Sequence, residues 1–157
     1  MVPFAPEYRA IARIREGVTK STRLGRPYGL AFLAEGLAWH GDRAAALAAL
    51  QEGLGIARTT GEHGWDAEIH RLAGTVLLAE NKLNEGVASL QQAIRIAQAQ
   101  QAKSLELRAA RDLARLWGEQ GRRTEARDLL APVYSWFTEG FDTADLKEAK
   151  ALLDQLA

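Results

Sequence analysis

The sequence predicts an all-α fold made of repeated antiparallel helix pairs, and three observations support this. Alanine and leucine supply 51 of the 157 residues whereas valine and isoleucine supply 11, which favours helix over strand. The chain is self-similar with a period of 40 residues, because the triplets Gly-Asp-Arg at 41–43, Asn-Lys-Leu at 81–83 and Gly-Arg-Arg at 121–123 start 40 positions apart. Each triplet ends one apolar run and opens the next, and its Gly or Asn suits a left-handed helix C-cap.

About eight helices are expected from the spacing of apolar residues. They cover approximately 6–22, 28–40, 43–60, 65–80, 83–101, 104–120, 123–138 and 143–156. In the first helix Ile11, Ile14 and Val18 share one face, and Pro27 stands at the start of the second, where its missing N–H is harmless.

The last two helices carry their own signals. Pro132 predicts a kink near Asp128–Pro132 or a helix that restarts there, because proline removes a hydrogen bond and clashes one turn back. Asp142 and Thr143 offer an N-cap for the final helix. Its apolar stripe of Leu146, Ala149, Leu153 and Leu156 identifies it as a C-terminal capping helix, which a stack of repeats needs to close its last apolar surface.

Small residues recur at fixed places on both sides of each turn. They are Ala34, Gly74 and Ala114 before the turn and Ala46, Gly86 and Ala126 after it. A small residue at both places lets two helix axes approach closely, so we expect the helices of each pair to cross there.

These sizes at these spacings resemble the tetratricopeptide repeat (TPR). In the first unit the order is Leu33-Ala34, Leu37, Gly41, Ala46, Leu50 and Gly53. The period of 40 instead of 34 is similar to the long repeats of MalT-like bacterial regulators, although the proline that ends a standard repeat is absent and His70 and Ala110 replace its first large residue. The segments 24–28, 68–72 and 134–141 look like the C-terminal repeat region of large bacterial signalling ATPases.

The resemblance implies a fold, a domain organisation and a function. The fold would be a right-handed TPR-like superhelix forming one domain over 1–157, with repeat units at about 25–63, 64–103 and 104–140, a helix of a preceding partial unit at 6–22, and the cap at 143–156. The function would be a protein–protein interaction scaffold in a regulatory or sensor region of a bacterial signalling or transcription-regulating ATPase. The partner would occupy the concave groove.

Composition limits the partners and the location. Twenty basic residues offset 20 acidic ones, so no global field recruits nucleic acid or an anionic membrane. No apolar stretch approaches the ~20 residues of a membrane span. The absence of cysteine and of a secretory signal at the N-terminus predicts a cytoplasmic protein.

Catalytic, cofactor and metal motifs are not expected in this chain. Residues 17–21 end like a phosphate-binding loop but lack the glycine before the lysine. His63 and His70 are seven positions apart, about 10.5 Å along a helix, which is too far for one metal ion to bridge. We therefore expect no enzyme activity, no cofactor and no metal.

The candidate partner-binding residues lie on the first helix of each pair, which lines the inner wall of such a superhelix. They are Tyr28, Glu35 and Trp39 with neighbouring Ala31, then Glu68, Arg71 and Thr75, then Arg108, Arg111 and Arg115. The groove would be aromatic and acidic at one end and basic at the other, and the arginines could hold an acidic peptide or domain edge.

Three alternatives stay open for this groove. Arg115 could pair with Glu119, and Arg108 and Arg111 could face Glu68 or water, which would leave no basic strip. Trp39 could simply cover a helix end. The chain could instead be a homodimerisation module, or a helical domain that senses a small ligand.

Overall fold

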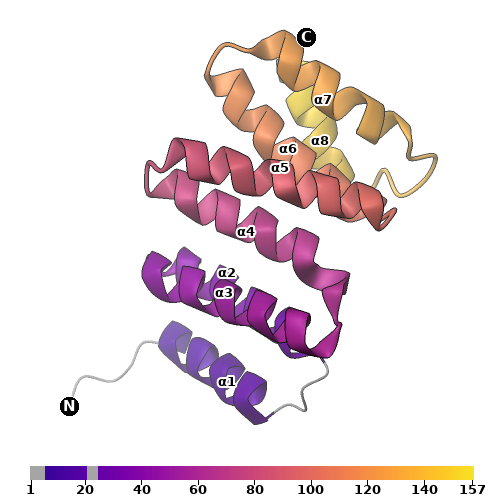
Figure 1. The fold of residues 1–157 in the computed structure, drawn as a ribbon. Helices are drawn as coiled ribbons and strands as arrows, with labels where there is room; N and C mark the ends of the chain where they lie inside the picture. The colour runs from indigo at the N-terminus through magenta and orange to yellow at the C-terminus, as the bar shows by residue number, and fades with distance from the viewer. Residues whose placement is uncertain (1–5, 21–24) are drawn as a thin grey trace.

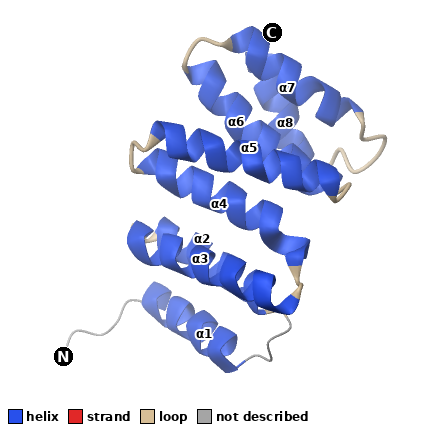
Figure 2. Cartoon of the chain, in the orientation of Figure 1, coloured by secondary structure: helices blue, strands red, loops and turns tan. Residues whose placement is uncertain are grey.

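The computed structural model describes the backbone of residues 6–20 and 25–157 and the side chains of 11–18 and 25–157. Eight α-helices and one short 3-10 helix make up these residues, which contain no strand (Figure 2). They are α1 (Pro6–Lys20), α2 (Arg26–Trp39), α3 (Arg43–Thr60), η1 (His63–Trp65), α4 (Asp66–Ala79), α5 (Leu83–Ala99), α6 (Lys103–Glu119), α7 (Arg123–Ser135) and α8 (Ala144–Gln155). The predicted all-α fold is confirmed, and the end of the first expected helix, at 21–22, lies outside the described residues.

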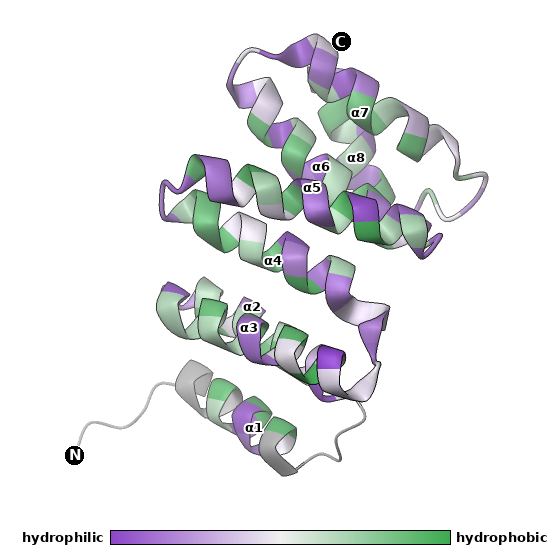
Figure 3. Cartoon of the chain, in the orientation of Figure 1, coloured by the Kyte–Doolittle hydropathy of each residue, from purple (hydrophilic) through white to green (hydrophobic). Residues whose placement is uncertain are grey.

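The helices form a stack of antiparallel pairs, α2 with α3, α4 with α5 and α6 with α7. Figure 1 shows α1 at one end of the stack and α7 and α8 at the other. Hydrophobic and hydrophilic residues alternate along the helices (Figure 3), as expected where each helix buries one side and exposes another.

The three predicted turns end their helices with a left-handed residue. Gly41, Asn81 and Gly121 have φ of 84°, 61° and 79°. At the first turn Gly41 N–H donates to the Ala38 carbonyl (3.0 Å) and Asp42 N–H to the Leu37 carbonyl (2.9 Å), the pair of bonds of a Schellman cap.

The turns between pairs also contain a left-handed residue. Gly61 (φ 79°) and Gln101 (φ 54°) lie 20 residues after Gly41 and Asn81, so a left-handed residue recurs every 20 positions from 41 to 121. The helices themselves differ in length, with 14 and 18 residues in α2 and α3, 14 and 17 in α4 and α5, and 17 and 13 in α6 and α7. The sequence pattern missed this half-period because glutamine is rarely found at positive φ.

The small residues lie at the helix crossings, as predicted. The alanines at 34, 46, 114 and 126 are at most 1% exposed. In the second pair a Cβ on Gly74 would lie 3.0 Å from the Gly86 carbonyl oxygen, and a Cβ on Gly86 would lie 3.1 Å from that of Gly74. The backbones of α4 and α5 thus come close enough to require glycine.

The C-terminal helices differ from expectation in three details. α7 is one helix that continues through Pro132 and ends at Ser135, so the alternative of a restart is wrong. Thr143 takes the N-cap position of α8, but its hydroxyl donates to the Gly140 carbonyl (2.7 Å) instead of capping the helix. Leu152 is buried on the stripe where Leu153 was expected, and Leu153 is partly buried beside it.

The apolar core is divided into two clusters. One joins α1, α2, α3 and α4, and the other joins α5, α6, α7 and α8. Charged side chains form ion pairs between α4 and α6, and they include three of the predicted binding residues, Glu68, Arg71 and Arg108.

Candidate functional site

The predicted binding residues lie on the first helices of the pairs, which form one row. α2 contacts α4, α4 contacts α6, and α6 contacts α8. We call the exposed side of this row the first-helix face. α8 was predicted as a cap, and it also continues the row because it packs on both α6 and α7.

Arg71 is the centre of a buried ion network between α4 and α6. Its guanidinium donates to both carboxylate oxygens of Glu68 (2.8 and 2.9 Å) and to Asp112 Oδ2 (2.6 Å). The three side chains are only 6–7% exposed. Two parallel bonds to one carboxylate are the strong geometry of arginine, so this cation is occupied within the protein.

Arg108 and Arg111 extend the network from α6 to α8. Arg108 lies 2.9 Å from Glu68 Oε1, and Arg111 lies 3.0 Å from Asp145 and 2.9 Å from Glu148. Arg111 also donates to Asp112 Oδ1 at 3.1 Å. Three consecutive first helices are therefore joined by charge pairs.

The electrostatics of Arg71 follow from two opposing causes. Burial disfavours the guanidinium charge and by itself lowers the pKa of Arg71. The hydrogen bonds and charges of Glu68 and Asp112 outweigh burial, so the pKa of Arg71 lies above its ordinary value. The arginine stays charged at every physiological pH, and it compensates two buried carboxylates that would otherwise be costly.

These ion pairs match the alternative raised from the sequence, in which the arginines pair with carboxylates of the protein itself. Arg108 does contact Glu68, as that alternative supposed. Arg115 approaches Asp112 at 3.8 Å and no ion pair joins it to Glu119 within the described chain. The remaining partners are Asp145 and Glu148 of α8, so four arginines meet four carboxylates and the predicted basic strip carries no net charge.

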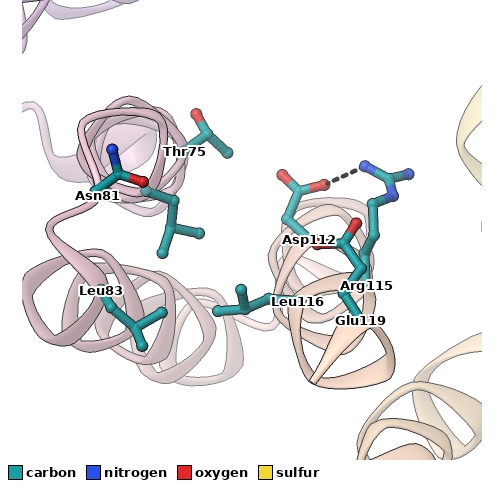
Figure 4. Close-up of a pocket in the computed structure, with 8 residues that line it drawn as sticks. Thr75, Asn81, Leu83, Asp112, Arg115, Leu116 and Glu119 are labelled. Atoms are coloured by element: carbon teal, nitrogen blue, oxygen red, sulfur yellow. Dashed lines mark ion pairs between the residues drawn. The ribbon is translucent and has the colours of Figure 1, made fainter. Parts of the chain in front are cut away.

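A pocket of about 540 Å³ opens where α4 and α6 separate beyond the ion network. It is lined by Thr75, Leu78, Asn81, Leu83, Asp112, Arg115, Leu116 and Glu119. Figure 4 shows Thr75 on the α4 side and Asp112 on the α6 side, with Leu83 and Leu116 below them. Thr75 donates its hydroxyl to the Leu72 carbonyl (2.8 Å), so that group is occupied by its own helix.

Arg115 is the predicted arginine that remains accessible at this pocket. Its side chain is 48% exposed, against 9% for Arg111 and 7% for Arg71. Asp112, the carboxylate nearest to it, already accepts bonds from Arg71 and Arg111. A carboxylate from outside can therefore bind Arg115 without breaking a close ion pair.

The α2 part of the predicted set is exposed, with one exception. Tyr28 is 40% and Trp39 88% exposed, and Glu35 is exposed between them. Ala31, predicted on the same face, is 3% exposed and belongs to the core. Phe32, four residues after Tyr28, is 48% exposed and lies on the face where Ala31 was expected. Residues four apart lie on the same side of a helix, and here that side is the exposed one.

Several residues of this face escaped the sequence prediction. They are Phe32, Trp65, Asp112, Leu116, Asp145 and Glu148. Asp112 lies next in sequence to the predicted Arg111, and Asp145 and Glu148 sit three apart on α8. The two α8 carboxylates could have been predicted by treating α8 as a continuation of the first-helix row and not only as a cap.

The residues that the structure describes contain neither a metal-binding cluster nor a membrane-spanning helix. No group of three or more His, Asp or Glu side chains there could hold a metal ion. None of the helices in that part is both long and apolar enough to cross a bilayer.

Comparison with known proteins identifies structural neighbours only. No protein-family model and no curated protein matches the sequence. A Podosopora anserina protein, described as a candidate kinesin light chain with nearly identical TPR-like repeats, superposes with a TM-score of 0.63 and 20% identity over 96% of this chain and 85% of that one. A single-substitution variant of it gives a TM-score of 0.68, also at 20% identity, over 96% of this chain and 76% of the other. The fold is thus that of TPR-like helical repeats.

Proposed function

We propose that this TPR-like domain is a protein-interaction scaffold that binds an extended segment of a partner protein on the first-helix face. The observation that carries the proposal is the pocket between α4 and α6, about 540 Å³, with leucines in its wall and Arg115 on its rim. Stacked helix pairs present long continuous surfaces of this kind, which suit extended partners.

The lining of the pocket supports a particular chemistry for that segment. Leu78, Leu83 and Leu116 offer apolar contact to one aliphatic side chain. Arg115 can hold a carboxylate on a neighbouring residue of the segment, since its contact to Asp112 is long. The partner would therefore carry an aliphatic residue next to an acidic one, which narrows the acidic partner expected from sequence.

Two peptides and two variants test this assignment. A serine-rich peptide with one leucine flanked by glutamates should bind, and the same peptide with lysines in place of the glutamates should not, as measured by isothermal titration calorimetry. Arg115→Glu should abolish binding of the glutamate peptide. Arg127→Glu, which makes the same charge change at an exposed position on α7, should leave it unchanged. Equal binding by both variants would refute the role of Arg115.

The cellular context is a finer proposal, supported by the resemblance of segments 24–28, 68–72 and 134–141 to bacterial signalling ATPases. In that context the domain would be a cytoplasmic regulatory or sensor region that contacts an NTPase module. The test is whether the natural polypeptide containing residues 1–157 carries such a module, and whether the isolated module binds this domain in a pull-down that Arg115→Glu weakens.

A small-ligand sensor is the second candidate, and the size of the pocket favours it. Its volume lies within the ~300–1,000 Å³ range of small-molecule sites. A small molecule that raises the melting temperature of the wild type but not of a Thr75→Trp variant would support this function over peptide binding. The remaining alternative, a homodimer, predicts a doubled mass in light scattering.

A further inference from the structure

One side of α2 carries an exposed aromatic stripe that the α4–α6 pocket does not use. Tyr28, Phe32, Glu35 and Trp39 follow one another at steps of four, three and four residues, which places them on a single helix face. The three rings are 40%, 48% and 88% exposed. The stripe extends for about 16 Å, since eleven residues rise by ~1.5 Å each.

Trp65 of η1 adds a fourth ring at one end of the stripe. Its ring centroid lies 4.3 Å from that of Tyr28, and Tyr28 lies 4.6 Å from Phe32 in an edge-to-face contact. Trp65 is 36% exposed. Large aromatic side chains are usually buried, and a contiguous exposed group of them indicates an interaction surface.

The four tryptophans of the chain divide into two kinds. Arg122 lies over the Trp117 ring at 4.5 Å, and Lys103 lies 5.9 Å from the centroid of Trp136. Trp39 and Trp65 have no cation over their rings within residues 11–18 and 25–157. The two tryptophans without a cation are the two that belong to the aromatic stripe.

Glu35 gives the stripe a charge to be matched. It is exposed, and no hydrogen bond or ion pair joins it to another side chain in the described part of the chain. Other charged groups near the stripe are occupied: Glu62 accepts from the Gly25 N–H (3.1 Å), Asp66 contacts His63 (2.8 Å), and Arg26 contacts Glu52 (3.3 Å).

We infer that the aromatic stripe binds a basic, extended segment of a partner protein. One arginine or lysine lies over Trp39, a second stacks at the end formed by Tyr28 and Trp65, and Glu35 pairs with one of these cations. Tryptophan and tyrosine faces attract cations, and the attraction increases when a carboxylate stands beside the ring. An extended chain rises ~3.3 Å per residue, so the two basic residues stand about five positions apart.

Nucleic acid fits this surface poorly. Aromatic stacking of bases works together with a basic groove that tracks the phosphates, whereas Glu35 places a negative charge in the stripe. The partner is therefore assigned as a protein segment.

Tryptophan fluorescence with synthetic peptides tests the inference. The probe is a Ser/Pro peptide with two arginines about five positions apart, and its control has glutamates in place of the arginines. The Ser/Pro peptide with arginines should bind saturably, and the Ser/Pro control with glutamates should not. Trp39→Ala should weaken binding of the arginine peptide roughly fivefold, and Glu35→Lys roughly tenfold.

Matched variants separate this effect from a general one. Trp136→Ala removes another exposed tryptophan, and Glu139→Lys makes the same charge change in the α7–α8 loop; both should leave arginine-peptide binding unchanged. Arg115→Glu should also leave it unchanged, so failure of the α4–α6 pocket proposal is distinguishable from failure here.

Three results would overturn the inference. They are equal binding of the two peptides, equal binding by Trp39→Ala and wild type, and absence of saturable binding up to millimolar peptide. A concentration-dependent dimer in light scattering that Trp39→Ala dissociates would assign the stripe to a second copy of the chain instead.

Discussion

Replacing Gly86 by alanine should destabilise the α4–α5 pair, although alanine is the better helix former. A Cβ at this position would lie 2.6 Å from Leu78 Cγ and 3.1 Å from the Gly74 carbonyl oxygen. The first contact involves a branch point and the second involves backbone, so neither relaxes cheaply. Alanine gains about 1 kcal/mol in helix propensity, and overpacking costs about 1–3 kcal/mol. We expect a net loss of about 1 kcal/mol.

In the other two repeats the position of Gly86 holds alanine, and the position of Leu78 holds a small residue. Forty residues before Leu78 and Gly86 stand Ala38 and Ala46, and forty residues after them stand Gly118 and Ala126. Where the second position has a Cβ, the first position is small. Leu78 therefore occupies space that the Cβ of alanine takes in the other repeats.

A double-mutant cycle isolates this contact. Leu78→Ala alone should destabilise the protein, because it removes a partly buried side chain from the core. In the Gly86→Ala background the same change also relieves the clash, so it should cost less by about 1–2 kcal/mol.

Urea denaturation of the wild type, both single variants and the double variant gives the coupling free energy. A coupling below about 0.5 kcal/mol, the usual limit of additivity, would show that Leu78 and Gly86 do not compete for space. Because Leu78 also lines the pocket, Gly86→Ala should in addition weaken binding of the serine-rich peptide with one leucine flanked by glutamates.

Three further predictions concern the network, the titration of one histidine and one turn. Arg71→Met should cost about 3 kcal/mol in urea denaturation, the lower end of the usual range for breaking a buried pair, because Glu68 keeps Arg108 and Asp112 keeps Arg111 as partners. Arg115→Met should cost less than about 1 kcal/mol, and equal losses would contradict the network. Burial lowers the pKa of His70 from its ordinary 6.5, and this effect outweighs the negative charge of Asp66, which raises the pKa. The unfolded chain therefore binds the proton of this histidine more readily than the folded chain does. Stability should therefore be constant above pH 6.5 and fall as the pH drops below it, and His70→Gln should flatten that fall in melting temperature. Gln101→Gly should stabilise by about 0.5 kcal/mol because φ is 54° there, while Gln100→Gly, at φ −84°, should destabilise; the same sign in thermal melts of both would refute the role of backbone strain.

Much of the fold could be predicted because its signals are local or periodic. A glycine at 41 or 121 marks a left-handed C-cap whatever surrounds it, and the 40-residue period places equivalent crossings in register. Gln101 escaped because its backbone conformation is imposed by the two helices it joins. The cap role of Thr143 was half right, since its position followed from the pattern but its hydroxyl bond did not.

The candidate site could be predicted only in part, because periodicity shows which helix face a side chain lies on but not what lies opposite. On α6, Arg108 lies beside Glu68 of α4, Arg111 beside Asp145 of α8, and Arg115 in the wall of the α4–α6 pocket. That Arg108 could face Glu68 was one of the alternatives open from the sequence, but the α8 carboxylates that pair with Arg111 were not foreseen, because α8 was expected only as a cap.

What the sequence by itself determined is the paired-helix repeat, the turns and the small residues at the crossings, because each depends on neighbours within about twenty positions. What the tertiary structure decided is which charges and rings are free. Arg71 and Asp112 are 41 positions apart and Arg111 and Asp145 are 34 apart, and stacking of α4, α6 and α8 brings each pair to 3.0 Å or less. The same stacking leaves Arg115 48% and Trp39 88% exposed, because among the side chains that the structure describes none from the next helix pairs with Arg115 or covers Trp39.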